Sequence, residues 1–394
     1  MRLAVFLTVV PFVWVALHLY MGRRLLGPFR APVVHPRVRA FGWSAIALAA
    51  GLPPLTMLLG RAGWLPGDGW ALLSFGLMGL SSILLTFVLL ADGIRYGSDL
   101  LGRLRRRSRT ADAPSDPSRR AVLGSMVNFG MVGTAGSLTG IGFVQARSLP
   151  EIVEVEVPIE GLPAAAEGFR IVQLSDVHIG PTIHGDFLEQ VVELANELEP
   201  DLVAITGDLV DGYVHELREH VAPLARLRAR HGAFFVTGNH EYYWDGPAWC
   251  AELERLGLMV LNNAHRVVDH DGAQLLVAGV TDYQAAEGIT GEPSNPAAAR
   301  AGAPACDVDL LLAHQPRSVF AAAKAGYDLQ ISGHTHGGQY FPMNLFVHLV
   351  QPYVAGLARH DDTQIYVSRG TGYWGPPVRV GAPHEITLLR LVRA

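Results

Sequence analysis

Cysteine is scarce in this chain, and its scarcity excludes two classes of small scaffold. The 394 residues include only two cysteines, Cys250 and Cys306. Two are too few for a disulfide framework or for a cysteine-rich zinc site. They are expected to be buried thiols. A single disulfide between them is the alternative if the surrounding region is exported.

Glutamate and lysine are missing from the first part of the chain. The first 147 residues contain 16 Arg and 5 Asp but no Lys and no Glu, and the first Glu is Glu151. That part therefore carries about +11, which leaves about −16 for the rest of a chain with a formal net charge of −5. Such an asymmetry indicates two regions in different surroundings. The arginines lie between apolar runs, so no nucleic-acid partner is expected.

Charge is absent from long apolar stretches in residues 1–147. The stretches 3–21, 41–60 and 70–91 contain no Asp, Glu, Lys or Arg, and each is near the ~20 residues that cross a bilayer. A fourth stretch, 121–146, is uncharged and rich in glycine. We predict an all-α membrane region of about four helices. Because the spans hold no functional charge, an anchor or export role is favoured over a transporter or receptor.

The arginines between the spans predict the orientation. The first connection carries five arginines and the third carries eight, whereas the second holds only Arg61 and Asp68. The positive-inside bias places the two arginine-rich connections in the cytoplasm. We therefore expect a multi-pass protein of the cell membrane, with residues 148–394 on the extracytoplasmic side.

The segment Ser118-Arg119-Arg120-Ala121-Val122-Leu123 has two interpretations. It resembles a twin-arginine export signal, which would make the twin-arginine export machinery a partner. Val144-Gln145-Ala146 resembles a cleavage site for such a signal. Alternatively, the two arginines only add to the positive-inside charge. Residues 112–118 are predicted to form a flexible linker before this segment.

Strand and helix patterns alternate in residues 148–394, which predicts an α/β domain. The predicted strands are 151–158, 170–174, 202–206, 233–237, 308–313 and 328–332, a hairpin of 266–268 with 274–280, and late strands at 363–368 and 385–391. The predicted helices are 187–198, 215–230, 247–256 and 316–325. Two packed sheets with helices outside would accommodate both parts. Residues 287–305 are predicted to form a surface loop.

Polar side chains with metal-binding chemistry follow several of these strands. Positions two apart share a face of a strand, so each Asp-x-His or His-x-His pair is expected to point to one side. Oxygen and nitrogen donors without thiolate suit Zn, Mn or Fe. Seven candidates exceed one tetrahedral site, so two ions that share one carboxylate are expected. The candidates are Asp176, His178, Asp208, Asn239, His314, His334 and His336.

The order of these motifs resembles a known family. Asp-x-His, Gly-Asp-x-x-Asp, Gly-Asn-His-Glu, a lone His and Gly-His-x-His follow one another from about Arg170 to the C-terminus. This order is similar to that of the calcineurin-like metallophosphoesterase superfamily. Gly337-Gly338-Gln339 and Val367-Ser368-Arg369-Gly370 resemble its membrane-associated, twin-arginine-exported (YkuE-like) branch. The three additional spans depart from the simplest members of that branch.

The resemblance implies a four-layer α/β/β/α sandwich with two divalent metal ions. It implies that one ion is held by Asp176, His178 and His336, the other by Asn239, His314 and His334, and both by Asp208. His240 would face the substrate and assist the leaving oxygen, while Asp211 and Glu241 would support loops. The implied reaction is hydrolysis of a phosphodiester, phosphomonoester or pyrophosphate by metal-activated hydroxide.

The substrate is less defined by the sequence. The apolar segment Tyr340–Gly356 and the pair Tyr373-Trp374 suit either a rim for a lipid-linked phosphate at the membrane or the ordinary packing of a capping loop. Two functional alternatives also stay open at this point. One is a non-catalytic metal- or phosphate-binding module on the same fold, and the other is a cytoplasm-facing lipid-precursor pyrophosphatase.

Overall fold

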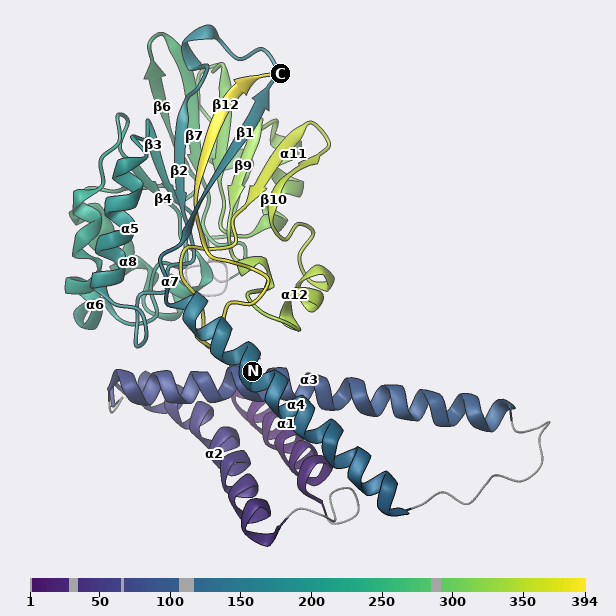
Figure 1. Ribbon diagram of the computed structural model, residues 1–394. Coiled ribbons are helices and arrows are strands. Elements are labelled where there is room, and N and C mark those ends of the chain that lie inside the picture. The colour runs from purple at the N-terminus through teal and green to yellow at the C-terminus, as the bar shows by residue number, and fades with distance from the viewer. Residues whose placement is uncertain (1, 28–34, 65–66, 106–116, 285–291) are drawn as a thin grey trace. The chain divides into compact units, whose positions relative to one another are not determined.

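The computed structural model describes residues 2–27, 35–64, 67–105, 117–284 and 292–394, which belong to two compact units (Figure 1). The first unit comprises Met1–Phe143 with Pro376–Val378, and the second comprises Val144–Gly375 with Arg379–Ala394. Among the residues for which predictions were made, Arg30, Arg106, Arg107, Arg109, most of the 112–118 linker and the beginning of the 287–305 loop lie outside this description.

Four long apolar helices form the first unit, as the sequence predicts. They are α1 (Arg2–Leu26), α2 (Pro36–Arg61), α3 (Asp68–Arg105) and α4 (Pro117–Ala146). All four are long and apolar enough to cross a membrane. Two boundaries differ from the prediction. Helix α3 continues well past residue 91, and α4 already begins at Pro117, a residue suited to the first turn of a helix, rather than after a linker that reaches residue 118.

A buried polar cluster connects α1, α3 and α4. The Arg24 guanidinium lies 2.6 Å from a carboxylate oxygen of Asp92, and the Tyr20 hydroxyl donates to the other oxygen at 2.6 Å. Arg24 also donates to the side-chain carbonyl of Asn128 at 3.0 Å. Asp92 is the residue directly after the predicted third span, where a charge is tolerated only with a partner. The cluster therefore fixes the relative register of these three helices.

Two six-stranded sheets form the body of the second unit. The first has the order β1-β12-β2-β3-β4-β5 and the second β10-β11-β9-β8-β7-β6. The strands of the first sheet are β1 (Glu151–Ile159), β2 (Arg170–Leu174), β3 (Leu202–Ile205), β4 (Ala233–Phe235), β5 (Met259–Val260) and β12 (Glu385–Arg393). Those of the second are β6 (Ala264–His270), β7 (Ala273–Gly279), β8 (Val308–Leu312), β9 (Leu329–Ser332), β10 (Gly356–His360) and β11 (Thr363–Val367).

Alternation along the buried strands produces the layers. In β2, Ile171 faces the core between the two sheets, whereas Val172 and Leu174 face the core beneath the helices. Helices α5 (Gly185–Glu197), α6 (Val214–Val221) and α8 (Gly246–Arg255) lie along one side in Figure 1. Helices α10 (Pro296–Arg300) and α11 (Val319–Ala325) pack on the second sheet. The predicted four-layer α/β/β/α sandwich is confirmed.

Several local predictions were wrong, each for a local reason. The helix predicted at 215–230 ends at Val221 and continues as a 3-10 turn, because Pro223 cannot donate the next helical hydrogen bond. The loop predicted at 287–305 contains α10, which Asn295 caps by accepting from the Ala298 amide. No element was predicted where strand β10 lies. Cys250 and Cys306 are free and only half-buried.

The directions of the strands show which chain segments meet at one edge of the first sheet. Strands β2, β3 and β4 run parallel, so their carboxyl ends share an edge. Strand β12 is antiparallel to β2 and parallel to β1. Strand β1 therefore begins at the same edge of the first sheet at which β2, β3 and β4 end.

We expect Asp92→Ala to lower the thermal stability of the full-length protein in detergent. The change leaves Arg24 buried without its carboxylate, and removing one partner of a buried pair typically costs about 3–5 kcal/mol. The measurement is the unfolding midpoint followed by tryptophan fluorescence. The exposed Asp99→Ala in the same helix is the matched control, and Arg24→Leu/Asp92→Leu should recover much of the loss. Equal midpoints for Asp92→Ala and wild type would contradict a stabilising role for the cluster.

Candidate metal centre

The candidate ligands converge through an unusual backbone rather than through the strand pleat. Strand β2 ends at Leu174 and β9 at Ser332, before the residues in question. Five of the seven candidates have left-handed backbone angles, with φ from 51° to 73°: Asp176, His178, Asp208, His334 and His336. The expectation that two-residue spacing on a strand aligns these side chains was therefore wrong. Such angles are costly for non-glycine residues and cluster at functional sites.

Two glycines allow the turning loops to approach each other. A Cβ on Gly333 would lie 2.0 Å from Ser175 Oγ and 2.2 Å from a carboxylate oxygen of Asp176. A Cβ on Gly238 would lie 2.2 Å from Asp208 Oδ1. Any larger residue at either position would displace a candidate ligand. The glycines of these two motifs therefore serve close packing of the site itself.

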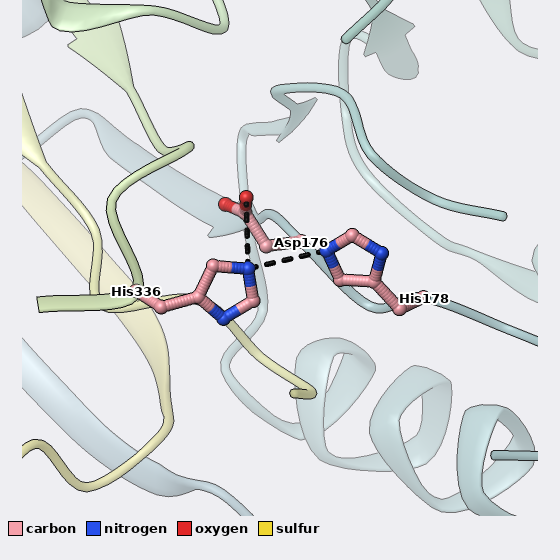
Figure 2. A group of neighbouring side chains, drawn as sticks. All are labelled: Asp176, His178 and His336. Carbon is pink, nitrogen blue, oxygen red and sulfur yellow. Dashed lines mark hydrogen bonds and ion pairs between the residues drawn. The ribbon is translucent and has the colours of Figure 1, made fainter. Parts of the chain in front are cut away.

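The first group consists of Asp176, His178 and His336 (Figure 2). The Nε2 atoms of His178 and His336 lie 3.1 Å apart, and His336 Nε2 lies 3.4 Å from Asp176 Oδ1. The His334 amide donates to both Asp176 oxygens at 3.0 Å, and the Ser175 hydroxyl donates to Oδ2 at 2.6 Å. Three donor atoms from two distant segments thus face one small space.

The second group consists of Asp208, His314 and His334. His314 Nε2 lies 3.0 Å from His334 Nδ1 and 3.1 Å from Asp208 Oδ2. The other ring nitrogen of His314 donates to the Thr206 carbonyl at 2.8 Å, so Nε2 is the nitrogen that faces Asp208 and His334. The Asn239 Oδ1 atom is buried and has no hydrogen-bond partner among the described residues. A buried acceptor of this kind fits a cation as its missing partner.

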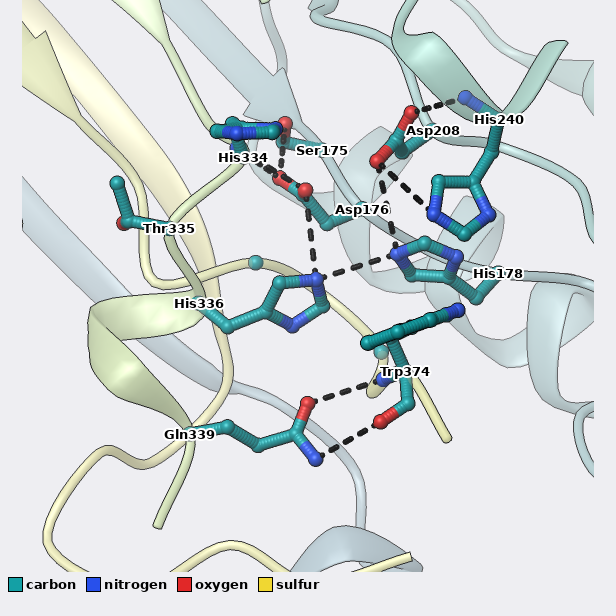
Figure 3. A network of polar contacts seen from close by, with 12 residues as sticks. Ser175, Asp176, His178, Asp208, His240, His334, Thr335, His336, Gln339 and Trp374 are labelled. Atoms are coloured by element: carbon teal, nitrogen blue, oxygen red, sulfur yellow. Dashed lines mark hydrogen bonds and ion pairs between the residues drawn. The ribbon is translucent and has the colours of Figure 1, made fainter. Parts of the chain in front are cut away.

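One carboxylate oxygen joins the two groups (Figure 3). Asp208 Oδ2, 3.1 Å from His314 Nε2, is also 3.9 Å from the Nε2 atoms of His178 and His240. Asp208 Oδ1 accepts from the His240 amide at 2.9 Å, which fixes the orientation of the carboxylate. Asp208 is therefore placed to serve both groups at once.

Two further carboxylates hold the site in shape. Glu241 accepts hydrogen bonds from the backbone amides of Asp208, Leu209 and Gly238, at 2.6–3.0 Å. Asp211 accepts from His178 Nδ1 at 3.1 Å through one oxygen and from His240 Nδ1 through the other. Glu241 thus fixes the loops, as expected from the sequence. Asp211 does more than support a loop, because it orients two imidazoles.

Arg379 is a site residue that the sequence analysis missed. Its guanidinium is fully buried and donates to the carbonyls of His336, Arg369, Gly372 and Ala382. It also lies 3.1 Å from His336 Nδ1. Burial lowers the pKa of Arg379 to about 9. One arginine in a Gly/Pro-rich loop carries no sequence signal, so only the folded structure places it against a candidate ligand.

Aromatic side chains border the cluster around His240. The ring of Tyr243 lies 5.1 Å from the imidazole, and that of Trp374 lies 5.5 Å away in an edge-on arrangement. Gln339 donates to the Trp374 carbonyl and accepts from its amide, each at 3.0 Å, as Figure 3 shows. Both aromatic side chains are nearly half-exposed. They form an open rim on which the non-reacting part of a substrate can rest.

Comparisons with known proteins agree with this geometry. Residues 169–338 match the model of the family described as calcineurin-like phosphoesterase. A zebrafish (Danio rerio) transmembrane protein with metallophosphoesterase domain is 36% identical over 336 residues, which cover 82% of this chain and 74% of the relative. The chain belongs to the calcineurin-like metallophosphoesterases. This family membership makes it a phosphoester hydrolase.

Some relatives of this metallophosphoesterase are bacterial. The Bacillus subtilis (strain 168) metallophosphoesterase YkuE is 33% identical over 294 residues, covering 70% of this chain and 97% of the relative. A Helicobacter pylori (strain ATCC 700392 / 26695) metallophosphoesterase is 38% identical over 273 residues, covering 68% and 72%. The transmembrane relatives and the four apolar helices together identify this metallophosphoesterase as a membrane protein.

The charges of this metallophosphoesterase site are strongly interdependent. Burial alone would lower the pKa values of His314 and His240, but the nearby carboxylates outweigh it. Asp208 raises the pKa of His314 to about 10, and Asp208 with Asp211 raises that of His240 to about 9. Burial, reinforced by the charge of His314, lowers the pKa of His334 to about 3. The two neighbouring imidazoles His314 and His334 are therefore not both cationic at neutral pH.

The donor set fits divalent metal ions. The described residues offer imidazole nitrogens, carboxylate oxygens and one orphaned amide oxygen, and no thiolate is among them. This mixture suits Zn, Mn or Fe. His178 and His314 each donate their Nδ1 proton to an acceptor outside the group, which leaves Nε2 as a ligand atom.

We expect Asp211→Asn to weaken metal binding without unfolding the domain. The amide keeps the shape but presents an NH₂ group to one of the two imidazoles, so either His178 or His240 loses its acceptor. Loss of such an outer partner typically lowers metal affinity about 10–100-fold. The metal affinity is measured by titrating the metal-free protein with metal ions in a calorimeter. The exposed Asp361→Asn is the control, and an unchanged affinity in Asp211→Asn would show that Asp211 does not orient the ligands.

Proposed function

We propose that this metallophosphoesterase binds two divalent ions and hydrolyses a phosphate ester with them. The membrane region would comprise residues 1–147 and the catalytic domain residues 148–394. The observation that carries the proposal is the position of Asp208 Oδ2, 3.1 Å from His314 Nε2 and 3.9 Å from His178 Nε2. One oxygen between two groups of nitrogen donors is the arrangement expected of a carboxylate that two ions share.

The ligand assignment follows from the two groups. Asp176, His178 and His336 would hold one ion, and Asn239, His314 and His334 would hold the other. Asp208 would contribute to both. When bound, a pair of divalent ions neutralises charge on the phosphoryl oxygens and makes water a stronger nucleophile at neutral pH. The ions also supply the positive charge that an acidic domain needs in order to bind an anion.

His240 would act on the leaving oxygen rather than on a metal ion. Its Nδ1 is engaged by Asp211, so Nε2 is the atom left to face a substrate. From there it can donate a hydrogen bond, or a proton, to the oxygen that departs from phosphorus. Asp211 keeps the imidazole in that orientation. Tyr243 and Trp374, which flank the ring, would contact the group attached to the departing oxygen.

The substrate is proposed to be a phosphodiester, phosphomonoester or pyrophosphate with a lipid-linked part. The support is the membrane region together with the half-exposed aromatic rim beside His240. Manganese, zinc and iron all fit the donor set, and none of the described contacts favours one of them over the others.

The catalytic domain is proposed to lie on the extracytoplasmic side of a four-span membrane region. The distribution of arginine supports this orientation, since it concentrates in the first and third connections. Arg119 and Arg120 lie in the first turn of α4, and we propose that the twin-arginine machinery exports the folded domain.

We expect the purified full-length protein, loaded with Mn or Zn, to hydrolyse bis-p-nitrophenyl phosphate. His240→Ala should lower kcat about 10²–10⁴-fold, the usual contribution of a positioned general acid, while the metal content stays at the wild-type value. His215→Ala, which removes an exposed histidine of the same domain, is the matched control. A fully metal-loaded wild type that matches His240→Ala in activity would instead support a non-catalytic binding module.

An epitope tag fused after Ala394 should place the catalytic domain outside the cytoplasm. The tag is expected to be digested by protease added to intact spheroplasts, while a cytoplasmic marker protein in the same cells survives. Survival of the tag together with the marker would overturn the proposed orientation and would favour a cytoplasm-facing lipid-precursor pyrophosphatase.

A further inference from the structure

An exposed apolar surface lies close to the candidate metal centre in the sequence. We call it the apolar segment and define it as Met343–Val350, which comprises α12 (Met343–Phe346) and the 3-10 turn Val347–Leu349. Five of its eight side chains are large, apolar and exposed, by 47% for Met343 up to 79% for Leu349: Met343, Leu345, Phe346, Leu349 and Val350. A contiguous patch of this kind marks an interaction site, whereas single exposed apolar residues do not.

Hydrogen bonds tie the C-terminal side of the apolar segment to the metal-site edge, and the chain ties its N-terminal side. The segment begins seven residues after His336, a candidate ligand. The Thr335 hydroxyl donates to the Val354 carbonyl at 2.6 Å, which returns the chain to the Gly-His-x-His turn. Arg317, in the turn that follows His314, donates to the Val350 carbonyl at 2.7 Å. The segment is therefore anchored beside the residues that would hold the ions, and α12 lies at the same end of the sandwich as α7 (Asn239–Tyr243) in Figure 1.

The chain enters the domain at this same edge. Strand β1 starts where β2, β3 and β4 end, because β1 is parallel to β12 and β12 is antiparallel to β2. Helix α4 ends at Ala146 and β1 begins at Glu151. Five residue steps span at most about 18 Å. Arg147 donates to the Thr182 carbonyl at 3.1 Å, so the connection is itself held against the domain. Connectivity thus keeps the metal-site edge near the end of an apolar helix.

We propose that the apolar segment inserts into the surface of the lipid bilayer. Residues 340–356 contain no Asp, Glu, Lys or Arg, so insertion requires no charge to leave water. Large aliphatic and aromatic side chains at the headgroup boundary are typical of interfacial anchors. The short connection after α4 makes the bilayer the surface that this segment meets at the highest effective concentration.

Insertion has a consequence for the substrate, which rests on the proposed hydrolase function. With the apolar segment in the bilayer, the rim formed by Tyr243 and Trp374 lies at the lipid surface. A phosphate ester with an apolar tail can then reach the site while its tail stays in the membrane. The insertion itself does not depend on the reaction and is tested separately from it.

Spin labels on the full-length protein in lipid nanodiscs test the insertion. Cys250 and Cys306 are first replaced by Ser, and a nitroxide is attached at Leu349→Cys, the most exposed position of the segment. The control is Glu160→Cys, at an exposed residue that follows the opposite end of β1. We expect the Leu349 label to be relaxed more by oxygen than by a water-soluble nickel chelate, and the Glu160 label to show the reverse order.

Two results would overturn the proposal. The first is greater relaxation by the nickel chelate at both positions, which would place the apolar segment in water. The second is strong spin–spin broadening at Leu349 that disappears on dilution with unlabelled protein, which would identify a second copy of the chain as the partner. Because exposed positions are labelled, an unchanged metal content in both variants shows that the domain is still folded. The hydrolysis of bis-p-nitrophenyl phosphate is measured in parallel, so a failed reaction and a failed insertion are distinguished.

Discussion

Buried lone pairs and negative charges are concentrated at one edge of the sheets. The residues around this edge are arranged to hold and compensate them. Asp176 and Asp208 are almost completely buried, and the nitrogen atoms of four histidines face them or one another. Burying such groups is unfavourable unless cations or hydrogen bonds compensate them. Glu241 accepts hydrogen bonds from backbone amides, and Asp211 accepts hydrogen bonds from two imidazoles. The metal ions proposed for the two groups of ligands would provide the missing compensation.

The backbone conformation of the candidate ligands is a second unfavourable contribution to the folding free energy. Five candidate ligands adopt left-handed angles, which the surrounding sandwich must impose. The two sheets, with a continuous apolar core between them, form a rigid base from which the loops turn inward. Gly238 and Gly333 let those loops approach within contact distance of Asp208 and Asp176. The stable core thus holds the strained loops in place, and the close fit of the loops creates the site.

The sequence predicted the layers and the candidate ligands because both depend on local patterns. Buried strands such as β2 and β8 appear as short apolar runs, and the motifs follow those runs directly. The route by which Asp176 and His178 converge was not predictable, because left-handed angles at non-glycine residues are imposed by tertiary contacts. Arg379 and the two imidazole partners of Asp211 were missed for a related reason, since each contact joins residues far apart in the chain. Helix α10 is too short to show a period.

Asp208 is proposed to join the two ligand groups into a single centre with two ions. Electron paramagnetic resonance of the full-length protein loaded with manganese tests this arrangement most directly. We expect two manganese ions per chain with an exchange-coupled spectrum, because a shared carboxylate would bring the ions close together. Asp208→Ala should lose that coupling. A wild-type spectrum of one isolated manganese ion per chain, at saturating metal, would contradict a shared centre.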